Sequence, residues 1–415
     1  MIHFERFILR NGLRVVVHED RSTPLVTMNI LYDVGSRDED PGFTGLAHLF
    51  EHLMFGGSVN IPDYDTPLQL VGAENNAFTS NDITNYYITI PAENIETAFW
   101  LESDRMLGLN FSQKSLDIQK NVVIEEYKQR YLNQPYGDAM LLLRPLAYKI
   151  HPYRWSTIGL DISHVEKADL ETVRNFFFSH YAPNNAILCL AGNISADRTR
   201  ELSEKWFESI EPGKIKKRNL QQEPLQTEAR QQTVERDVPA DAFYKVWHTV
   251  SRLDTDFQTL DLLSDILSGG ESGRLNKVLV REKRLFSEIN AYITSDLDPG
   301  LIVIYGNVMK DVDLKYAENA VIDLLEELKV PGAIPDDEVE KVKNRFESTN
   351  VFSNTNALNK AVNLSFYELM GRAEMINTEI DIYRKITAKM IGDSARKYFL
   401  NSNCSTLYYK SDRKS

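Results

Sequence analysis

The first 35 residues have the apolar pattern of β-strands. Strong β-forming residues occupy 7–9 and 13–18, with Asn11-Gly12 between them, which is a strong short-range signal for a hairpin. A further apolar run at 26–34 predicts a third strand. The chain therefore begins with β-structure.

The apolar positions change to helical spacing between residues 44 and 57. Thr44 is a candidate N-cap, and Gly56-Gly57 would end the helix. The helical period is carried by Leu46, Leu49, Phe50, Leu53 and Met54. This segment predicts one amphipathic helix directly after the first strands.

The remainder of the first half mixes strands and helices. Strands are predicted at 76–80, 84–90 and 186–191, and helices at 95–107, 115–131 and 169–180. Residues 211–224 are polar, locally basic and interrupted by Pro and Gly, which is typical of a linker.

Beyond this linker the order of elements repeats coarsely. A strand at 243–250 precedes a helix at 257–267, and strands at 289–295 and 301–308 lead into further helices. We therefore expect two α+β halves from an old duplication, each a mostly antiparallel sheet packed with helices. The predicted boundaries are 1–212 for the first half, 213–228 for the linker and 229–415 for the second half.

Composition narrows the class of protein. The chain has 415 residues, 42% hydrophobic and 26% charged, which is ordinary for globular domains. Its net charge of −13 makes nucleic acid and anionic membranes poor partners. Two cysteines are too few for a disulfide framework. With neither a signal-peptide pattern nor a membrane-spanning apolar run, we expect a cytoplasmic protein, or a periplasmic one if a signal has been removed.

The predicted helix at 44–57 carries the residues that point to chemistry. His48 and His52 are one helical turn apart, so both imidazoles project from one face, with Glu51 beside them. Two such imidazoles can hold one Zn²⁺, and a carboxylate that is not a ligand can act as general base. This is the H-x-x-E-H pattern, the inverse of H-E-x-x-H.

A catalytic zinc needs a third protein ligand and a position open to water. The adjacent pair Glu125 and Glu126, on the predicted helix at 115–131, supplies the candidates. Spacing alone does not separate the two neighbours.

Motifs along most of the chain resemble the pitrilysin-type (M16) metallopeptidases, which include insulysin and the mitochondrial processing peptidases. The motifs are GSRDED at 35–40, HLFEHLMFGG at 48–57, VGAENNAFTS at 71–80, TNYY at 84–87, NVVIEE at 121–126, HPYRW at 151–155 and YAPNN at 181–185. The match is to the shorter members, such as the processing-peptidase beta subunit and its bacterial relatives. The resemblance implies the LuxS/processing-peptidase-like metallohydrolase fold, in which one chain is about half of a closed chamber.

The resemblance assigns roles to the motif residues. It implies that His48, His52 and Glu126 are the ligands of one Zn²⁺ per chain, and that Glu51 is the general base. Glu125 remains a reserve candidate. The family often has a supporting Glu seven residues before the third ligand, where this chain has Gln119.

The resemblance also implies a substrate-binding edge strand. Asn76, Ala77 and Phe78 would lie along a peptide that joins the sheet as an added β-strand, held by backbone hydrogen bonds. Such contacts tolerate many peptide sequences.

One family feature is incomplete. Complete sites in the family use an Arg and a Tyr, seven residues apart, to stabilise the oxyanion. Here Arg281 is present, but Glu288 stands at the Tyr position and would repel an oxyanion, while Tyr292 is out of register. We therefore expect a zinc-bearing endopeptidase subunit that pairs with a paralogous, zinc-less partner supplying Arg and Tyr.

Two alternatives remain open. A self-sufficient homodimeric processing peptidase would need another oxyanion donor, such as Tyr292 after a local shift. A scaffold subunit would keep zinc for structure alone, although the intact Glu51 argues against that role. In either enzymatic case the expected substrates are peptides and small unfolded polypeptides, while the cleavage preference is not encoded in these motifs.

Overall fold

A computed structural model of the chain describes residues 1–215 and 218–412. Residues 216–217, inside the predicted linker 213–228, and residues 413–415, at the end of the predicted second half, lie outside the described residues. The chain divides into two compact units. The first comprises Met1–Tyr127, Trp155–Leu220 and Val351–Thr378, and the second comprises Lys128–Arg154, Gln221–Asn350 and Glu379–Ser415.

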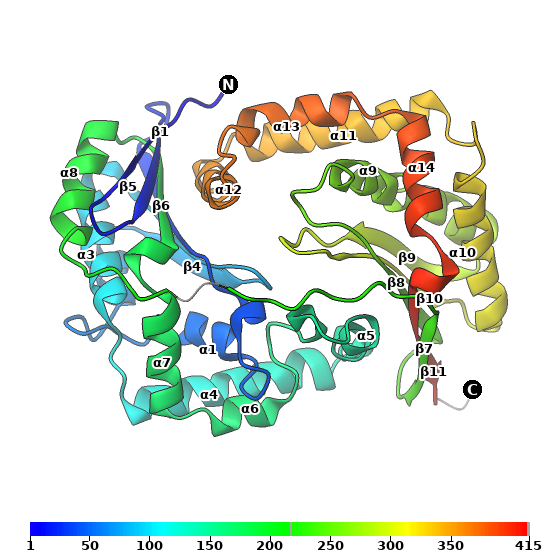
Figure 1. The fold of residues 1–415 in the computed structure, drawn as a ribbon, viewed down its shortest axis with the longest axis horizontal. Coiled ribbons are helices and arrows are strands. Elements are labelled where there is room, and N and C mark those ends of the chain that lie inside the picture. The colour runs from blue at the N-terminus through cyan, green and yellow to red at the C-terminus, as the bar shows by residue number, and fades with distance from the viewer. Residues whose placement is uncertain (216–217, 413–415) are drawn as a thin grey trace. The chain divides into compact units, whose positions relative to one another are not determined.

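The first unit combines one sheet with helices (Figure 1). Its strands are β1 (Glu5–Ile8), β2 (Arg14–Glu19), β3 (Leu25–Tyr32), β4 (Glu74–Thr79), β5 (Thr84–Pro91) and β6 (Ala186–Gly192). Its helices are α1 (Leu46–Leu53), α2 (Asp65–Leu70), α3 (Ile95–Leu107), α4 (Gln113–Tyr127), α6 (Ile162–Lys167), α7 (Leu170–His180), α8 (Ala196–Phe207) and α12 (Ala357–Leu369). Short 3₁₀ turns are η1 (Ser36–Asp38), η2 (Ala92–Asn94) and η5 (Pro183–Asn185).

The sheet of the first unit has the order β1-β2-β6-β3-β5-β4. Only the β2/β6 pair is parallel. Every residue of β6 is buried, which explains its unbroken apolar sequence, because a strand covered on both faces needs no polar alternation. β4 lies at the edge, and its side chains alternate between exposed and half-buried.

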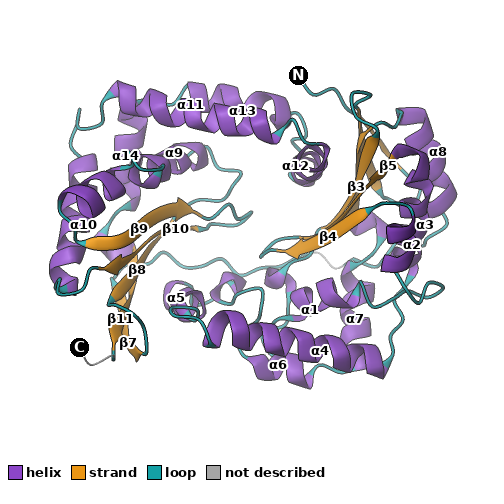
Figure 2. Cartoon of the chain, turned by 180° about the vertical axis from the view of Figure 1, so that it is seen from behind, coloured by secondary structure: helices purple, strands orange, loops and turns teal. Residues whose placement is uncertain are grey.

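The second unit has its own sheet and helices (Figure 2). Its strands are β7 (Arg230–Arg236), β8 (Ala242–His248), β9 (Phe286–Ile293), β10 (Leu301–Val308) and β11 (Cys404–Ser411). Its helices are α5 (Ala139–Ala147), α9 (Phe257–Ser268), α10 (Leu314–Leu328) and α14 (Ala388–Tyr398), with π-helical η3 (Lys128–Leu132) and η6 (Leu275–Glu282) and 3₁₀ turns η4 (Pro152–Arg154) and η7 (Asn401–Asn403). Helices α11 (Asp336–Ser353) and α13 (Met375–Arg384) each have residues in both units.

The two sheets share one strand order. The second sheet runs β7-β11-β8-β10-β9, with β7/β11 parallel and the other pairs antiparallel. This is the order of β2-β6-β3-β5-β4 in the first unit, where the corresponding pair β2/β6 is the parallel one. The predicted α+β class with two tandem, mostly antiparallel halves is confirmed.

Each unit contains a helix from the other half of the sequence. Helix α12, late in the chain, packs on β3 and β6 of the first unit, where Leu364 and Tyr367 contact Leu31 and Cys189 in one buried cluster. Helix α5, early in the chain, packs on β8 and β11 of the second unit, with Leu143 in a cluster that includes Leu407. The helices thus cover equivalent strands in the two sheets.

Two elements differ in detail from their predicted form. The helix predicted at 115–131 is α-helical only to Tyr127 and continues as the π-helix η3. Thr44 does not cap α1, because Gly45 occupies the N-cap position. The Thr44 hydroxyl instead accepts from the Leu160 backbone N–H and contacts His164 Nδ1.

Candidate metal centre

Helix α1 begins with an unusual cap. Gly45 has φ +90°, a left-handed conformation that favours glycine, and a Cβ there would lie 2.8 Å from the Ile158 carbonyl oxygen. Because glycine has no side chain to cap the helix, the buried Glu39 carboxylate does so. Its oxygens accept from the backbone N–H groups of Gly45 at 2.9 Å and Ala47 at 2.8 Å.

The apolar side of α1 is fixed by aromatic packing. The Phe50 ring lies 5.1 Å from Phe176 and 5.2 Å from Tyr181, measured between ring centroids. Leu46, Leu49 and Leu53 are also buried. His48, Glu51 and His52 occupy the remaining, half-buried side of the helix.

Helix α4 brings a carboxylate to the same place. Figure 1 shows α4 beside α1, and the two helices are in contact. Lys120 tethers α4 to the end of α6 by donating to the carbonyl oxygens of Glu166 and Ala168. This contact helps to hold a helix that buries only Leu116 and Val123.

His48, His52 and Glu126 converge at this helix pair. The Glu126 Oε2 atom lies 3.6 Å from His48 Nε2 and 3.4 Å from His52 Nε2. One ligand atom from each residue lies within 4.8 Å of the others, and no other such group was found among the residues that the structure describes. The side chains are 13%, 25% and 16% exposed, so the cluster is accessible to solvent.

Glu51 lies outside this ligand group and contacts another element. Its Oε2 atom accepts a hydrogen bond of 2.6 Å from the Thr79 hydroxyl of β4. Burial raises the pKa of the Tyr86 and Tyr181 phenols, and the nearby charge of Glu51 raises it further. Glu51 thus lies outside the His48/His52/Glu126 group and is held by Thr79, an arrangement suited to a carboxylate that acts as a base without being a metal ligand.

The loop that follows α1 is anchored by a buried ion pair on α3. Arg105, 1% exposed, donates to both carboxylate oxygens of Glu102. Its guanidinium carbon also lies 4.5 Å from the Tyr64 ring centroid and 4.4 Å from that of Tyr86. Through these two ring contacts Arg105 joins the loop after α1, which contains Tyr64, to strand β5, which contains Tyr86 and pairs with β4.

The predicted substrate strand is at the edge of the first sheet. Asn76 and Phe78 are exposed, whereas Ala77 lies on the same face as Thr79, because alternate residues of a strand share a face. The Asn76 Oδ1 atom accepts from the Ala77 backbone N–H at 2.8 Å. Their role in binding substrate stays a prediction.

Two further residues of α4, Glu125 and Gln119, are reserve candidates. Glu125 is exposed and does not belong to the His48/His52/Glu126 cluster. Gln119 is half-buried on the same helix, seven residues before Glu126.

The predicted oxyanion segment belongs to the second unit. Arg281, 53% exposed at the end of η6, forms an ion pair of 2.5 Å with Glu271. Glu288 lies on β9 and accepts from the Asn290 side-chain amide. Tyr292, on the same strand, is 40% exposed.

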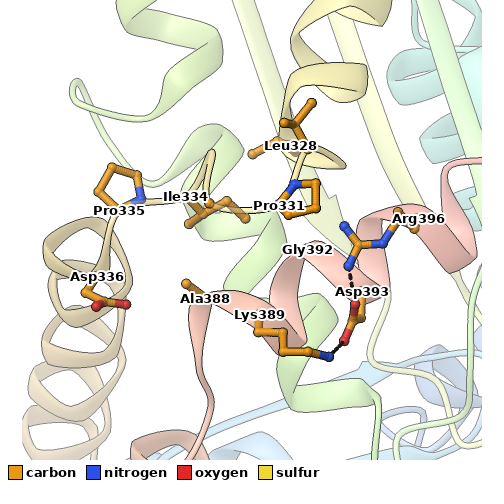
Figure 3. A pocket seen from close by; sticks show the side chains of 12 residues that line it. Leu328, Pro331, Ile334, Pro335, Asp336, Ala388, Lys389, Gly392, Asp393 and Arg396 are labelled. Carbon is orange, nitrogen blue, oxygen red and sulfur yellow. Dashed lines mark hydrogen bonds and ion pairs between the residues drawn. The ribbon is translucent and has the colours of Figure 1, made fainter.

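A separate pocket of about 570 Å³ lies within the second unit (Figure 3). Its apolar lining includes Leu328 and Ile334. Its two cationic side chains, Lys389 and Arg396, both form ion pairs with Asp393. Both cations of the pocket are therefore already neutralised by one carboxylate.

The structure brings to the site three residues whose contacts the sequence did not predict, although one of them, Thr79, belongs to the predicted substrate strand. They are Glu39, Thr79 and Arg105, which act on α1, on Glu51 and on the loop after α1, respectively. Glu39 and Thr79 lie within the quoted motifs GSRDED and VGAENNAFTS, so the motifs contained them without indicating their contacts.

Two α+β units of matching topology, one of them bearing a His/His/Glu cluster, define the class of the paired-half metallopeptidases. The family described as "Insulinase (Peptidase family M16)" matches residues 14–158, and "Peptidase M16 inactive domain" matches residues 167–346. The chain belongs to the M16 peptidase family.

Individual relatives agree with this assignment. The chain is 29% identical to "Zinc protease PqqE" of Helicobacter pylori, covering 98% of this chain and 92% of the relative. It is 24% identical to the "Probable mitochondrial-processing peptidase subunit beta, mitochondrial" of Arabidopsis thaliana, over 82% and 66% of the two chains. A crystal structure of a Helicobacter pylori protease superposes with a TM-score of 0.93 at 27% identity, covering 99% of this chain and 100% of the other.

Within the described part of the chain, no helix combines the length and apolar character needed to cross a bilayer.

Proposed function

We propose that this chain is a zinc-dependent endopeptidase subunit that cleaves peptides and small unfolded polypeptides. The observation that carries the proposal is the convergence of His48, His52 and Glu126 from two helices, with Glu51 beside but outside the group. Relatives named as zinc proteases support the same reaction class.

The three clustered residues fit a zinc ion. Two imidazole nitrogens and one carboxylate form a known donor set of catalytic zinc, and partial exposure of the cluster allows a substrate to approach. Zinc, when bound there, would polarise the scissile carbonyl group and lower the pKa of a water molecule. We propose one ion per chain.

Glu51 would perform the proton transfers. It would take a proton from the attacking water and pass it to the leaving amine, which requires a carboxylate held within hydrogen-bonding distance of both. The Thr79 contact gives Glu51 a defined orientation for this task.

Strand β4 would bind the peptide. It is the last strand of the first sheet, so an extended peptide can join it through backbone hydrogen bonds. We propose that Asn76, Ala77 and Phe78 line that added strand.

We propose further that a zinc-less paralogue pairs with this chain. Glu288 at the Tyr position carries a charge that opposes an oxyanion, and Arg281 is already paired with Glu271. A partner supplying Arg and Tyr would complete the site. A self-sufficient homodimer is the alternative, and a scaffold role is the least compatible with the Glu51 geometry.

The test is turnover of a mixed set of quenched-fluorescent peptides by the purified chain, with bound zinc measured in parallel. We expect Glu51→Gln to keep zinc and lose turnover, and Glu126→Gln to lose both. Glu125→Gln, the adjacent matched control, should keep both. Loss of zinc from Glu125→Gln but not from Glu126→Gln would overturn the ligand assignment.

The same assay tests whether the chain needs a partner subunit for activity. Zinc-dependent turnover by the chain alone would refute an obligate heterodimer. The heterodimer would be supported if the zinc-loaded chain shows no turnover alone but is activated by a paralogue that has Arg and Tyr in register. Absence of turnover with that partner would refute the peptidase proposal in favour of a scaffold.

A further inference from the structure

The candidate base Glu51 is held by a side chain from the proposed substrate strand. Thr79 Oγ1 donates to Glu51 Oε2 at 2.6 Å, and both side chains are half-buried. A donor at one oxygen restrains rotation of the carboxylate, whose terminal torsion is otherwise broad. The contact therefore selects one orientation of the base.

The contact also ties the base to the register of β4. Thr79 is the last residue of the strand and pairs with Thr84 of β5, while Ala77, two residues earlier, shares its face. β5 is held in turn by its antiparallel pairing with β3 and by the Arg105 guanidinium against Tyr86. One strand, β4, thus carries both the predicted peptide contacts and the donor to the base.

We propose that Thr79 is a positioning residue that orients Glu51 for proton transfer and sets its place relative to a peptide bound on β4. The proposal rests on the peptidase function proposed above. It assigns to Thr79 no contact with metal or substrate. Its effect is on the step that needs an oriented base, so Thr79 should influence kcat rather than peptide affinity.

The catalytic test compares Thr79→Val with Thr79→Ser in the active chain or chain pair. We expect Thr79→Val, which keeps the shape but removes the donor, to lower kcat about 10- to 100-fold with KM changed less than about 2-fold. Thr79→Ser should restore kcat to within about 3-fold of wild type because it retains the hydroxyl. Zinc content should not change in either variant.

A matched control lies in the same sheet. The Thr89 hydroxyl of β5 forms a hydrogen bond of 3.0 Å with the Thr27 hydroxyl of β3, so its partner lies in the sheet and not at Glu51. Thr89→Val removes a threonine hydroxyl of similar burial, and we expect it to leave kcat unchanged. Equal losses of kcat in Thr79→Val and Thr89→Val would mean a general effect on the sheet and would overturn the proposal.

A second readout does not depend on activity. In the metal-free chain, Thr79→Val should lower the thermal unfolding midpoint of wild type by about 1–4 °C, and this shift should vanish in a Glu51→Ala background. If the midpoint shifts of Thr79→Val and Glu51→Ala simply add in the double variant, no Thr79–Glu51 bond exists and the proposal is overturned. So would a rise in KM at constant kcat, or failure of Thr79→Ser to rescue.

The two readouts separate this inference from the proposed function. If no Glu51-dependent turnover is found with any partner, the peptidase function fails and the positioning role in catalysis fails with it. The Thr79–Glu51 contact itself would still be confirmed or refuted by the midpoints.

Discussion

The Glu39 carboxylate gives a quantitative prediction about the metal centre. It is 5% exposed and accepts the N–H groups of Gly45 and Ala47, immediately before the first metal-ligand candidate, His48. Replacing Glu39 with Gln keeps the side-chain length and one acceptor oxygen, but it turns an amide N–H₂ toward one of the two backbone donors. The change therefore removes one cap bond without deleting the side chain.

The magnitude follows from opposing contributions. A hydrogen bond to a charged group is worth about 1.5–3 kcal/mol, and a buried donor left without an acceptor costs about 1–3 kcal/mol. Against this, burial raises the pKa of Glu39, which means that the folded state bears a cost for holding the carboxylate ionised. We therefore expect Glu39→Gln to destabilise the first turn of α1 by about 1–3 kcal/mol.

This loss should appear in metal affinity as well as in stability. If zinc binding must order the frayed turn, 1–3 kcal/mol corresponds to an affinity that is about 5- to 150-fold weaker. The assays are zinc competition with a chromophoric chelator and amide hydrogen exchange of α1. The expected result is weaker zinc binding with faster exchange at residues 46–49.

The control is a helix cap in the other unit. Asp313 accepts the Tyr316 N–H at the start of α10, so Asp313→Ala should cost about 1 kcal/mol of stability without changing zinc affinity. Unchanged zinc affinity and unchanged exchange in Glu39→Gln would refute the role of Glu39 in organising α1.

Three further predictions concern the ligand set and two buried groups. Glu126→His, which keeps a zinc-ligating group, should retain more zinc than Glu126→Gln, as measured by metal analysis after dialysis, because the remaining two histidines alone leave the site under-coordinated. Arg105→Met should destabilise the first unit by about 3–5 kcal/mol in urea unfolding, since it leaves the buried Glu102 without a cation and with only the Tyr64 hydroxyl as a donor, and a second change, Glu102→Leu, should recover most of the loss. Burial raises the pKa of Asp261 to about 6 despite the hydrogen bond from Tyr383, so its contribution to stability is present below pH 4 and is lost as the pH rises through 6. Urea unfolding at pH 4 and pH 7 should show wild type losing about 2 kcal/mol relative to Asp261→Asn, and parallel pH profiles would contradict this.

The local patterns predicted most of the first unit correctly. The Asn11-Gly12 hairpin, the helix that carries His48, and the strands before and after it all follow from periodicity and turn chemistry. The patterns of β2, β3 and α1 are clear because these elements are largely buried or amphipathic, whereas the mostly exposed β1 is indicated by the Asn11-Gly12 turn. The predicted ligand set remains a prediction, although the structure brings its three members together.

Contacts distant in sequence could not be predicted in the same way. Nothing in the periodicity of α12 indicates that Leu364 joins a buried cluster with Leu31, more than 300 residues earlier. An apolar helix face shows that it will be buried, but not which element will cover it. Glu39 and Thr79 are similar cases. A carboxylate six residues before a glycine, and a hydroxyl at the end of a strand, acquire their roles only when the chain folds.

The matching strand orders show why the site depends on side chains rather than on the backbone. Helix α9 follows β8 in the second sheet as α1 follows β3 in the first, but in place of two histidines it carries Asp261 and Asp265, one turn apart. Asp261 accepts from the Tyr383 hydroxyl, and Asp265 lies 3.8 Å from Arg345, so both serve contacts within their own unit. The same scaffold therefore supports packing in one unit and a candidate metal-binding cluster in the other, and the difference depends on which side chains α1 and α4 present.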